Sequence, residues 1–347
     1  MSNPLLTAAV DRVASGLDLS ADEAAGVLRE VMEGRVSEVQ TAAFLIALRA
    51  KGETVDELTG LARTMRDLSL KVEVPGDGDL ALLDTAGTGG GRPTFNVSTT
   101  AALVAAGAGC RVAKHGNRSA TGLSGSADLL EALGARIDLD PPAIADCIAE
   151  VGFGFMFAPR HHAAMRHVVV VRRELAVRTI FNFVGPITNP AGATRQVIGV
   201  ADHAFPDTVA GALGALGGRR ALVVSSEDGL DEISVSAPTR VVELRDGTRR
   251  HFRISPEELG VDTAPHDALG AGTPKRNAEV ARAVLRGEPG PERSVTVLNA
   301  GAAIYVADGS EDLIGGVRAA EEAIDSGAAI AVLERYLEVS RRLAPAA

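Results

Sequence analysis

The sequence predicts an α/β protein in two parts, a small N-terminal α-helical domain and a large α/β domain with a largely parallel central sheet. Helix-start signals recur at close spacing in the first seventy residues, whereas short apolar runs alternate with helical stretches after them. The chain has 347 residues, of which 46% are apolar, so it can bury a large core and a smaller one. We place the helical domain at residues 1–72 and the α/β domain at residues 73–347, and a helical segment near 170–190 is expected to join the first domain.

The N-terminal part is predicted to contain about four helices. Pro4 suits the first turn of the first helix, and Gly16, Gly34 and Gly52 stand where helices are expected to stop. Three capping boxes give the starts of later helices: Ser20 with Glu23, Ser37 with Gln40, and Thr54 with Glu57. Apolar residues recur at helical spacing in two groups, which are Val39, Ala43, Ile46 and Ala47, and Leu58, Leu61, Met65 and Leu68.

A linker is predicted at residues 71–79, where Pro75, Gly76 and Gly78 interrupt regular structure. Beyond it, strand-like runs separated by helical stretches predict parallel strands at residues 80–83, 111–113, 153–157, 197–200 and 221–225. Residues 239–244 and 250–254 flank Asp246-Gly247 and are predicted to form a hairpin. The tail from Leu313 is expected to form two helices.

The composition excludes some classes of partner. A net charge of −10 argues against a long nucleic-acid groove or an anionic membrane surface, because both need basic stripes. The first residues lack a signal-peptide pattern and no apolar run is long enough to span a bilayer, so a cytoplasmic protein is expected. The two cysteines, Cys110 and Cys147, match no metal or redox spacing and are expected to be buried thiols.

The most informative segment is a glycine-rich turn at residues 84–99. An apolar strand-like run enters it and an alanine-rich helical run, residues 98–108, leaves it. Glycines there allow backbone N–H groups to approach an anion, and the helix N-terminus adds partial positive charge. Asn96, Ser98 and Thr99 would stand at the helix start as caps or as direct donors. The pattern is neither the dinucleotide fingerprint nor a P-loop, and a glycine-rich turn without a ligand remains the alternative.

A second polar cluster follows the next strand-like run. Lys114-His-Gly-Asn-Arg118 leads into residues 119–126, which add the hydroxyls of Ser119, Thr121, Ser124 and Ser126. Two cations, an imidazole, an amide and four hydroxyls in so short a stretch are unusual for a solvated loop. A glycine-rich turn beside a fixed cation is what binding of a phosphorylated sugar requires.

The order of motifs along nearly the whole chain resembles the anthranilate phosphoribosyltransferase family. The motifs are Gly87-Thr-Gly-Gly90, Asn96-Val-Ser-Thr99, Lys114-His-Gly-Asn-Arg118, Gly125-Ser-Ala-Asp-Leu-Leu-Glu-Ala-Leu-Gly134, Phe157-Ala-Pro-Arg-His-His162, Arg178-Thr-Ile-Phe-Asn182, Gly185-Pro-Ile-Thr-Asn-Pro190 and Gly229-Leu-Asp-Glu-Ile-Ser234. The resemblance implies a Mg²⁺-dependent, homodimeric transferase. Its reaction would join phosphoribosyl pyrophosphate to the amine of anthranilate, the second step of tryptophan biosynthesis.

The resemblance also assigns site residues. Those for phosphoribosyl pyrophosphate are Gly87, Gly90, Gly91, Thr94, Asn96, Val97, Ser98, Thr99, Lys114 and Ser126. Those for anthranilate are Gly87, Asn117 and Arg172, whose guanidinium suits a carboxylate. The metal would be held by Ser98, Asp231 and Glu232. His115 and His162 are expected to position the substrate, since an aniline nitrogen is already neutral and nucleophilic and need not have a general base. A packing role or a role as proton acceptor remains the alternative for each histidine.

Two features leave alternatives open. Asp231 and Glu232 are adjacent, so they serve one substrate only from a loop, or they hold two ions, or they are surface carboxylates of an acidic protein. The family usually has an Asp where this chain has Gly91, in a loop one residue longer, and Arg92 would then contact phosphate or face solvent.

Two rival functions share the predicted fold. One is a pyrimidine nucleoside phosphorylase, against which the Lys114–Arg118 and Asp231-Glu232 motifs count. The other is a non-catalytic, nucleic-acid-binding relative, which would carry a basic patch and an eroded substrate motif. The acidic composition and the presence of Asn117 and Arg172 disfavour it.

Overall fold

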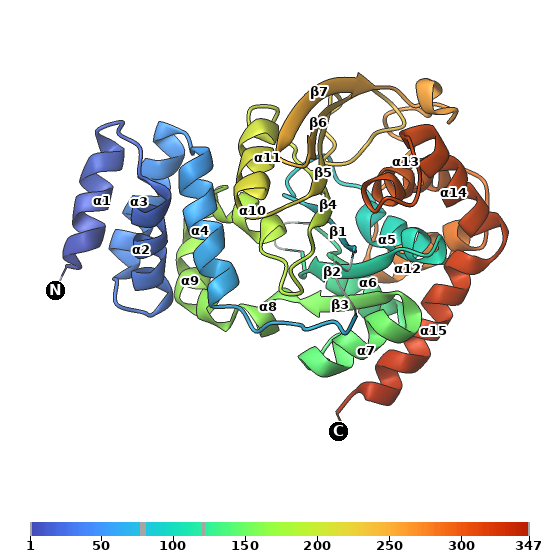
Figure 1. Cartoon of the computed structure of the whole chain (residues 1–347), viewed down its shortest axis with the longest axis horizontal. Coiled ribbons are helices and arrows are strands. Elements are labelled where there is room, and N and C mark those ends of the chain that lie inside the picture. Colours follow the sequence, from blue (N-terminus) through green and yellow to red (C-terminus); the bar gives the residue numbers. More distant parts are fainter. Residues whose placement is uncertain (1, 77–80, 120–121, 346–347) are drawn as a thin grey trace.

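A computed structural model describes residues 2–76, 81–119 and 122–345 of the chain. A bundle of helices lies at one end and a sheet flanked by helices makes up the rest, with the C-terminal helix on the side away from the bundle (Figure 1). The bundle contains α1 (Pro4–Ala14), α2 (Ala21–Met32), α3 (Glu38–Lys51) and α4 (Val55–Asp67), together with α9 (Arg166–Leu175) and α10 (Phe181–Val184). This arrangement confirms the predicted fold class.

The N-termini of the bundle helices follow the predicted caps, with one exception. Ser20 and Thr54 form complete capping boxes with Glu23 and Glu57. Ser37 accepts a hydrogen bond from the Gln40 backbone N–H, but the Gln40 side chain does not return to Ser37. Its amide instead pairs with the backbone of Asn3, accepting from N–H at 3.0 Å and donating to C=O at 3.1 Å. The predicted third box is therefore a bond between the starts of α1 and α3.

The apolar stripe predicted on α3 does not form the core of the bundle. Val39 is 78% exposed and Ile46 is 39% exposed, and Ala43 is also exposed. The buried side of α3 is formed by Thr41, Phe44, Leu45 and Leu48. The helix thus carries apolar residues on two sides, and spacing alone did not show which of them faces inward.

The sheet has seven strands in the order β3-β2-β1-β4-β5-β6-β7. The strands are β1 (Leu82–Gly87), β2 (Arg111–Gly116), β3 (Phe153–Phe157), β4 (Arg195–Gly199), β5 (Arg220–Ser226), β6 (Thr239–Arg245) and β7 (Thr248–Ile254). Strands β3 to β5 in this order are parallel, and the β6–β7 hairpin adds two antiparallel strands at one edge. Asp246 and Gly247 both have positive φ in its turn, as predicted.

Alternate residues of the central strands face two different cores. In β4, Val197 belongs to one core and Ile198 to the other, and in β5 Leu222 and Val223 divide in the same way. The first core lies between the sheet and helices from residues 97–151 and 274–343, and the second continues through α11 (Pro206–Ala215) into the helical bundle. The bundle is therefore packed onto one face of the sheet rather than tethered to it.

The remaining helices lie mainly around the first core. They are α5 (Val97–Gly107), α6 (Ser126–Leu133), α7 (Pro141–Val151), α8 (Ala158–His161), α12 (Pro274–Leu285), α13 (Pro291–Val306), α14 (Leu313–Asp325) and α15 (Ala328–Leu343). The last two are the helices predicted for the tail. Both cysteines are buried free thiols, as expected.

Some boundaries differ from the predictions or fall outside the described ranges. The predicted linker and first strand include residues 77–80, which lie outside the described residues, and β1 is seen from Leu82 to Gly87. Strand β2 runs three residues further than predicted, to Gly116, so that Lys114 and His115 lie within the sheet. Within the described ranges, no helix combines the length and apolar character needed to cross a membrane.

Candidate active site

The predicted phosphate-binding turn lies at the point where the sheet changes its winding direction. The chain runs from β1 outward to β2 and β3, and then returns to place β4 on the other side of β1. In open α/β sheets, ligands bind outside the carboxyl ends of the strands at such a position. The glycine-rich loop, defined here as residues 87–92, leaves the end of β1 there and is tied to the end of β4 by the Thr88 N–H, which donates to the Gly199 carbonyl at 2.8 Å.

The glycine-rich loop packs directly on a second loop, residues 227–234, which we call the acidic loop. The Gly89 N–H donates to Asp231 Oδ2 at 2.9 Å. A Cβ at Gly87 would lie 2.8 Å from Asp231 Oδ2, and one at Gly91 would lie 2.6 Å from Asp231 Oδ1. Glycine at both positions is therefore needed for this close approach. The Asp usual in the family at position 91 would collide with Asp231 in this arrangement.

Asp231 and Glu232 lie in a loop, which resolves one of the alternatives left by the sequence. Burial raises the pKa of Asp231, and burial together with the neighbouring Asp231 charge raises the pKa of Glu232 to about 8. Glu232 faces the Ser98 backbone N–H at the start of α5 and the Lys114 ammonium. The metal ligands expected from the sequence are thus brought to one place.

This pair of carboxylates fits a magnesium ion. Mg²⁺ binds oxygen ligands and is commonly held by one or two carboxylates together with substrate phosphates. A cation beside the two acidic side chains would offset the loss of hydration that raises both pKa values and the Asp231 charge that further raises the pKa of Glu232. Within the described ranges, no group of three or more His, Cys, Asp or Glu side chains forms a fuller metal cage, so remaining ligands would have to come from other oxygen groups, such as substrate.

Lys114 lies beneath the glycine-rich loop, not at the surface. Its side chain is 2% exposed, and its ammonium donates to the Thr85 carbonyl at 2.6 Å. Asp84, which is fully buried, accepts bonds from the His115 N–H at 3.1 Å and the Asn189 amide at 2.7 Å. Burial raises the pKa of Asp84 to about 6 despite the nearby Lys114 charge. Sequence reasoning gave Asp84 and Asn189 no role, although both stand inside quoted motifs.

Asn96 begins α5 but does not cap it with its side chain, contrary to one of the two roles predicted. Its carboxamide oxygen accepts from Ser124 Oγ at 3.0 Å and from the Asn277 amide at 2.8 Å, and its amide donates to the Ser124 carbonyl. The side chain therefore connects α5 to residues 122–126 and to α12. The contact between Asn96 and Asn277 could not be found from sequence motifs, because the two residues are 181 positions apart.

The other predicted phosphate-binding residues surround the start of α5 and α6. Thr94 donates to the Phe95 carbonyl, and Ser126 Oγ donates to the Asn117 carbonyl at 3.2 Å. Val97 is buried in the first turn of α5. Thr99 is 1% exposed and its hydroxyl has no hydrogen-bond partner within the described residues.

The residues expected to hold the aromatic acid come from separate elements. Arg172 on α9 is half-buried over the Phe181 ring, with the guanidinium carbon 5.6 Å from the ring centroid, and burial lowers its pKa. No hydrogen bond or ion pair occupies its guanidinium in the described part of the chain, so it is available to a carboxylate. Asn117, at the end of β2, is exposed and accepts from the Arg118 N–H at 2.7 Å.

His115 and His162 are neighbours, with ring centroids 5.1 Å apart. Burial and the other histidines hold the pKa of His115 well below its usual value and lower that of His162 to about 4. Both are therefore neutral at pH 7. His115 Nε2 and both ring nitrogens of His162 are buried without a hydrogen-bond partner within the described residues, so they remain available to a polar ligand group.

Arg178 is a cation of the site that sequence reasoning did not assign, although it begins a quoted motif. It lies between α9 and α10 and donates to the Gly89 carbonyl at 3.2 Å. Its guanidinium occupies the space where a Cβ at Gly90 would stand, and its charge acts on Asp231. Arg118, by contrast, is bound to Asp128 and Glu131 on α6 and stabilises the loop between them.

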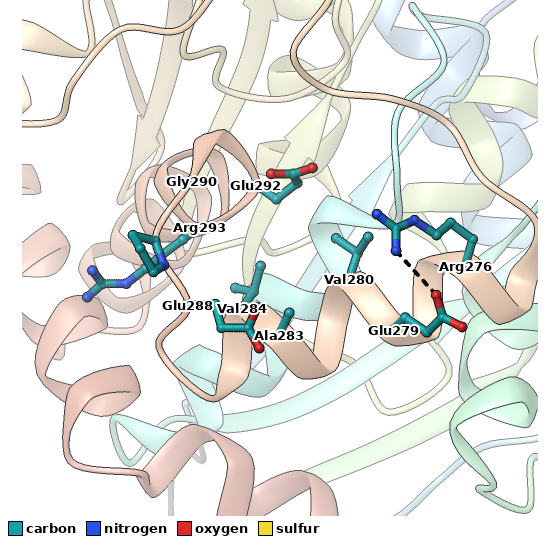
Figure 2. A pocket seen from close by; sticks show the side chains of 10 residues that line it. Arg276, Glu279, Val280, Ala283, Val284, Glu288, Gly290, Glu292 and Arg293 are labelled. Atoms are coloured by element: carbon teal, nitrogen blue, oxygen red, sulfur yellow. Dashed lines mark hydrogen bonds and ion pairs between the residues drawn. The ribbon is translucent and has the colours of Figure 1, made fainter.

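One hollow on the α/β domain is separate from these residues. It has a volume of about 360 Å³ and is lined by α12, the turn after it and the start of α13 (Figure 2). Arg276 and Glu279 on its wall are paired at 3.2 Å. None of the predicted site residues lines it, so it does not bear on the chemistry at the sheet.

Comparisons with known proteins agree with this arrangement. Residues 7–69 match the family described as glycosyl transferase family, helical bundle domain, and residues 79–330 match its a/b domain. A protein of Symbiobacterium thermophilum named anthranilate phosphoribosyltransferase is 50% identical over 339 residues, which are 97% of this chain and 98% of that protein. One of Rubrobacter xylanophilus with the same name is 51% identical over 98% of this chain and 99% of its own length.

The chain belongs to the anthranilate phosphoribosyltransferase family. A solved structure from Thermus thermophilus, described as a member of the family, has a TM-score of 0.90 and 45% identity, with 96% of this chain and 99% of that chain covered. A Saccharomyces cerevisiae anthranilate phosphoribosyltransferase, solved in complex with PRPP and Mg, has a TM-score of 0.88 and 26% identity over 98% of this chain and 99% of that chain. The resemblance drawn from the motifs is thereby confirmed, and neither rival function is favoured.

Proposed function

We propose that this protein transfers the phosphoribosyl group of phosphoribosyl pyrophosphate to the amine of anthranilate. The products are N-(5-phosphoribosyl)anthranilate and pyrophosphate, and the reaction is the second step of tryptophan biosynthesis. The observation that carries the proposal is the meeting of the glycine-rich loop, the buried Lys114 and the Asp231–Glu232 pair at the switch point of the sheet. The names of relatives about 50% identical over nearly the full length support it.

The donor substrate would lie over the glycine-rich loop and the start of α5. Backbone N–H groups of the loop suit phosphate oxygens, and the partial positive charge at the start of α5 adds to their effect. The proposed set is Gly87, Gly90, Gly91, Thr94, Asn96, Val97, Ser98, Thr99, Lys114 and Ser126. Arg178 is added to this set because its guanidinium already reaches the loop.

The metal is assigned to Ser98, Asp231 and Glu232. When bound, Mg²⁺ would neutralise the pyrophosphate and stabilise the negative charge that gathers on it as it leaves. The chain's own contribution is to hold the two carboxylates in a half-buried loop, where water competes weakly for a cation.

The chemical step needs positioning more than proton transfer. The bond from the ribose carbon C1 to the pyrophosphate oxygen breaks, and a bond from C1 to the anthranilate nitrogen forms, with loss of one proton from that nitrogen. Arg172 would hold the anthranilate carboxylate, and Gly87 and Asn117 would contact the same substrate. His115 and His162, being neutral, would orient it without repelling a cationic sugar.

We also propose a homodimer, domain limits of 1–72 and 73–347, and a cytoplasmic location. The dimer is supported by the exposed apolar stripe of α3, formed by Val39, Ala43, Ile46 and Ala50. Helix α9, which packs against α3, adds exposed Val169, and Val177 follows it. An apolar stripe exposed in this way is a feature of protein–protein interfaces.

The proposed reaction is tested by mixing the purified protein with phosphoribosyl pyrophosphate, anthranilate and Mg²⁺ and following anthranilate fluorescence. We expect the signal to fall, and to stay constant when EDTA replaces Mg²⁺. The Asp231→Asn and Glu232→Gln variants, which keep the side-chain size, should lose activity by roughly a hundredfold or more, because an oxygen ligand with charge is replaced by a neutral amide.

Arg293→Met serves as a control, since Arg293 pairs with Asp325 far along the chain and lines none of the site. It should retain the activity of the unaltered protein. A constant fluorescence signal with the folded, metal-supplied protein would refute the proposed reaction. Full, Mg²⁺-dependent activity in both carboxamide variants would refute the metal assignment alone.

A further inference from the structure

Arg92 is the only arginine of the glycine-rich loop, and its side chain is enclosed. It is 15% exposed, and Nη2 lies 3.0 Å from Asp228 Oδ2, whose side chain is 8% exposed. Its other terminal nitrogen donates to the His266 carbonyl, and its backbone N–H donates to the Gly229 carbonyl at 3.0 Å. Both terminal nitrogens of the guanidinium are therefore occupied, and Nε is buried without a hydrogen-bond partner within the described residues. The side chain is thus enclosed between the two loops and is not placed to act as a direct phosphate ligand.

Asp228 is a fixed anchor at the start of the acidic loop. Its carboxylate accepts from Ser226 Oγ at 2.7 Å, from Ser234 Oγ at 2.8 Å and from the Leu230 N–H at 3.3 Å. Burial alone would raise the pKa of Asp228, but these hydrogen bonds and the Arg92 charge outweigh it and hold the pKa below its usual value. The carboxylate is thus ionised at neutral pH and held by both ends of its own loop.

The two loops fit together sterically as well as electrostatically. A Cβ at Gly91 would lie 3.0 Å from the Gly229 carbonyl oxygen in addition to its collision with Asp231. Arg92, which forms the ion pair with Asp228, is the residue directly after Gly91. The departure from the family pattern at Gly91 and Arg92 therefore has a single structural result, a shorter loop that is seated on the acidic loop and fastened there.

We propose that the Arg92–Asp228 ion pair is a strap that holds the glycine-rich loop in register with Asp231, which makes Arg92 a positioning residue for phosphoribosyl pyrophosphate. This inference rests on the proposed function for the identity of the ligand. A loop ordered before the ligand arrives does not lose its conformational entropy on binding, so the strap raises affinity without touching the substrate. It also keeps the N–H groups of the loop close to the proposed metal carboxylates.

The test compares Arg92→Met, Asp228→Asn and the double variant with the unaltered protein. Titration calorimetry measures the Kd of phosphoribosyl pyrophosphate in the presence of Mg²⁺, and steady-state assays separate KM from kcat. Hydrogen–deuterium exchange of a peptide covering residues 86–93 reports loop order without any ligand. Arg293→Met, which removes a more exposed Arg–Asp pair elsewhere in the same domain, is the control.

We expect each single variant to raise Kd and KM roughly tenfold, as for loss of a charge-assisted pair, with kcat at saturation changed much less. Loop exchange should become faster, and the double variant should be no worse than either single one. Arg92→Lys should recover part of the affinity. The Arg293→Met control should bind like the unaltered protein.

Several results would contradict the proposal that the Arg92–Asp228 pair holds the loop. Unchanged Kd and loop exchange in Arg92→Met would do so, as would additive effects in the double variant, because independent residues do not form a pair. A fall in kcat with no change in Kd would instead indicate direct action on the reaction. If the unaltered protein failed to bind phosphoribosyl pyrophosphate, the proposed function would fail, while the exchange experiment would still decide whether Arg92 fastens the loop.

Discussion

Single residues at the site act largely through their burial. Lys114, Asp84 and His162 are each less than one-tenth exposed, and loss of water shifts the pKa of all three toward the neutral form. Sequence motifs correctly drew attention to Lys114 and His162. They did not show that Lys114 lies within the sheet, because its burial depends on β2 continuing beyond Ala113 to Gly116.

The histidine pair predicts a pH dependence of stability. Burial, with the nearby His161 and Lys71 charges, lowers the pKa of His162 from 6.5 to about 4 in the folded protein. The folded state therefore binds fewer protons than the unfolded state between these values. The stability that neutral His162 provides is fully present above pH 6.5 and is lost as pH falls toward 4, by up to about 3 kcal/mol.

The measurement is urea unfolding, followed by circular dichroism, at several pH values between 4.5 and 7.5. His162→Gln cannot titrate in this range, so the unaltered protein should lose free energy of unfolding relative to the variant as pH falls. Asp84 also titrates abnormally, but its contribution is common to both proteins and largely cancels in the difference. The pKa of His115 is lowered in part by the His162 charge, so this coupling belongs to the measured difference. A difference that stays constant with pH would contradict the lowered pKa of His162.

At the scale of elements, local signals predicted starts and turns better than faces. The strand at Phe153–Phe157, the turn at Asp246-Gly247 and the caps at Ser20 and Thr54 are as predicted, because each depends on neighbouring residues. The prediction of which face of α3 points inward was wrong, because that face is determined by packing against α1 and α9, which lie elsewhere in the chain.

The same distinction applies to the site. The glycine-rich loop and the Asp231–Glu232 pair could be found from motifs, since each motif is contiguous. Arg178, Asp228 and Asn277 could not, because their contacts join segments between 89 and 181 residues apart. For the same reason the sequence did not decide whether Arg92 contacts phosphate or faces solvent, because its partner Asp228 lies 136 residues away.

The capping residues differ in their expected contribution to stability. Glu57 is fully buried and accepts from the Leu19 N–H at 3.0 Å, the Thr54 N–H at 2.9 Å and the Lys51 ammonium at 3.0 Å. Glu57→Ala leaves the Leu19 and Thr54 N–H groups without this partner and removes one of the partners of the Lys51 ammonium, so it should lower the free energy of unfolding by about 3 kcal/mol or more. Ser37→Ala removes one exposed cap and should cost about 1 kcal/mol.

Chemical denaturation of the two variants beside the unaltered protein measures both values. The comparison is informative because both residues stand at helix starts in the same bundle and differ mainly in burial. Equal losses would show that the connection of Glu57 to Leu19 and Lys51 contributes nothing beyond an ordinary cap.

For the whole molecule, the acidic composition and the anionic substrate are compatible because the cations are concentrated. The chain carries a net charge of −10, yet Lys114 and Arg178 lie near the carboxyl end of β1 together with N–H groups of the glycine-rich loop, and the half-buried Arg172 guanidinium adds a cation on α9. Composition predicted the absence of a long basic groove but not this local arrangement. The packing of the bundle onto one sheet face through α11 places α9 in the same core as that face of the sheet.

The last prediction concerns the proposed homodimer and the exposed apolar stripe on α3. In a twofold interface each residue of the stripe meets the same surface of the partner, so a charge placed there is present twice and repelled or desolvated. Val39→Glu combined with Ile46→Glu should therefore convert the proposed dimer into a monomer of 35.7 kDa, measured by size-exclusion chromatography with light scattering. Ile314→Glu on α14, where the original side chain is 41% exposed, is the control and should leave the dimer intact. If the double variant stayed dimeric, the interface would lie elsewhere. If the unaltered protein were monomeric, the proposed homodimer itself would be wrong.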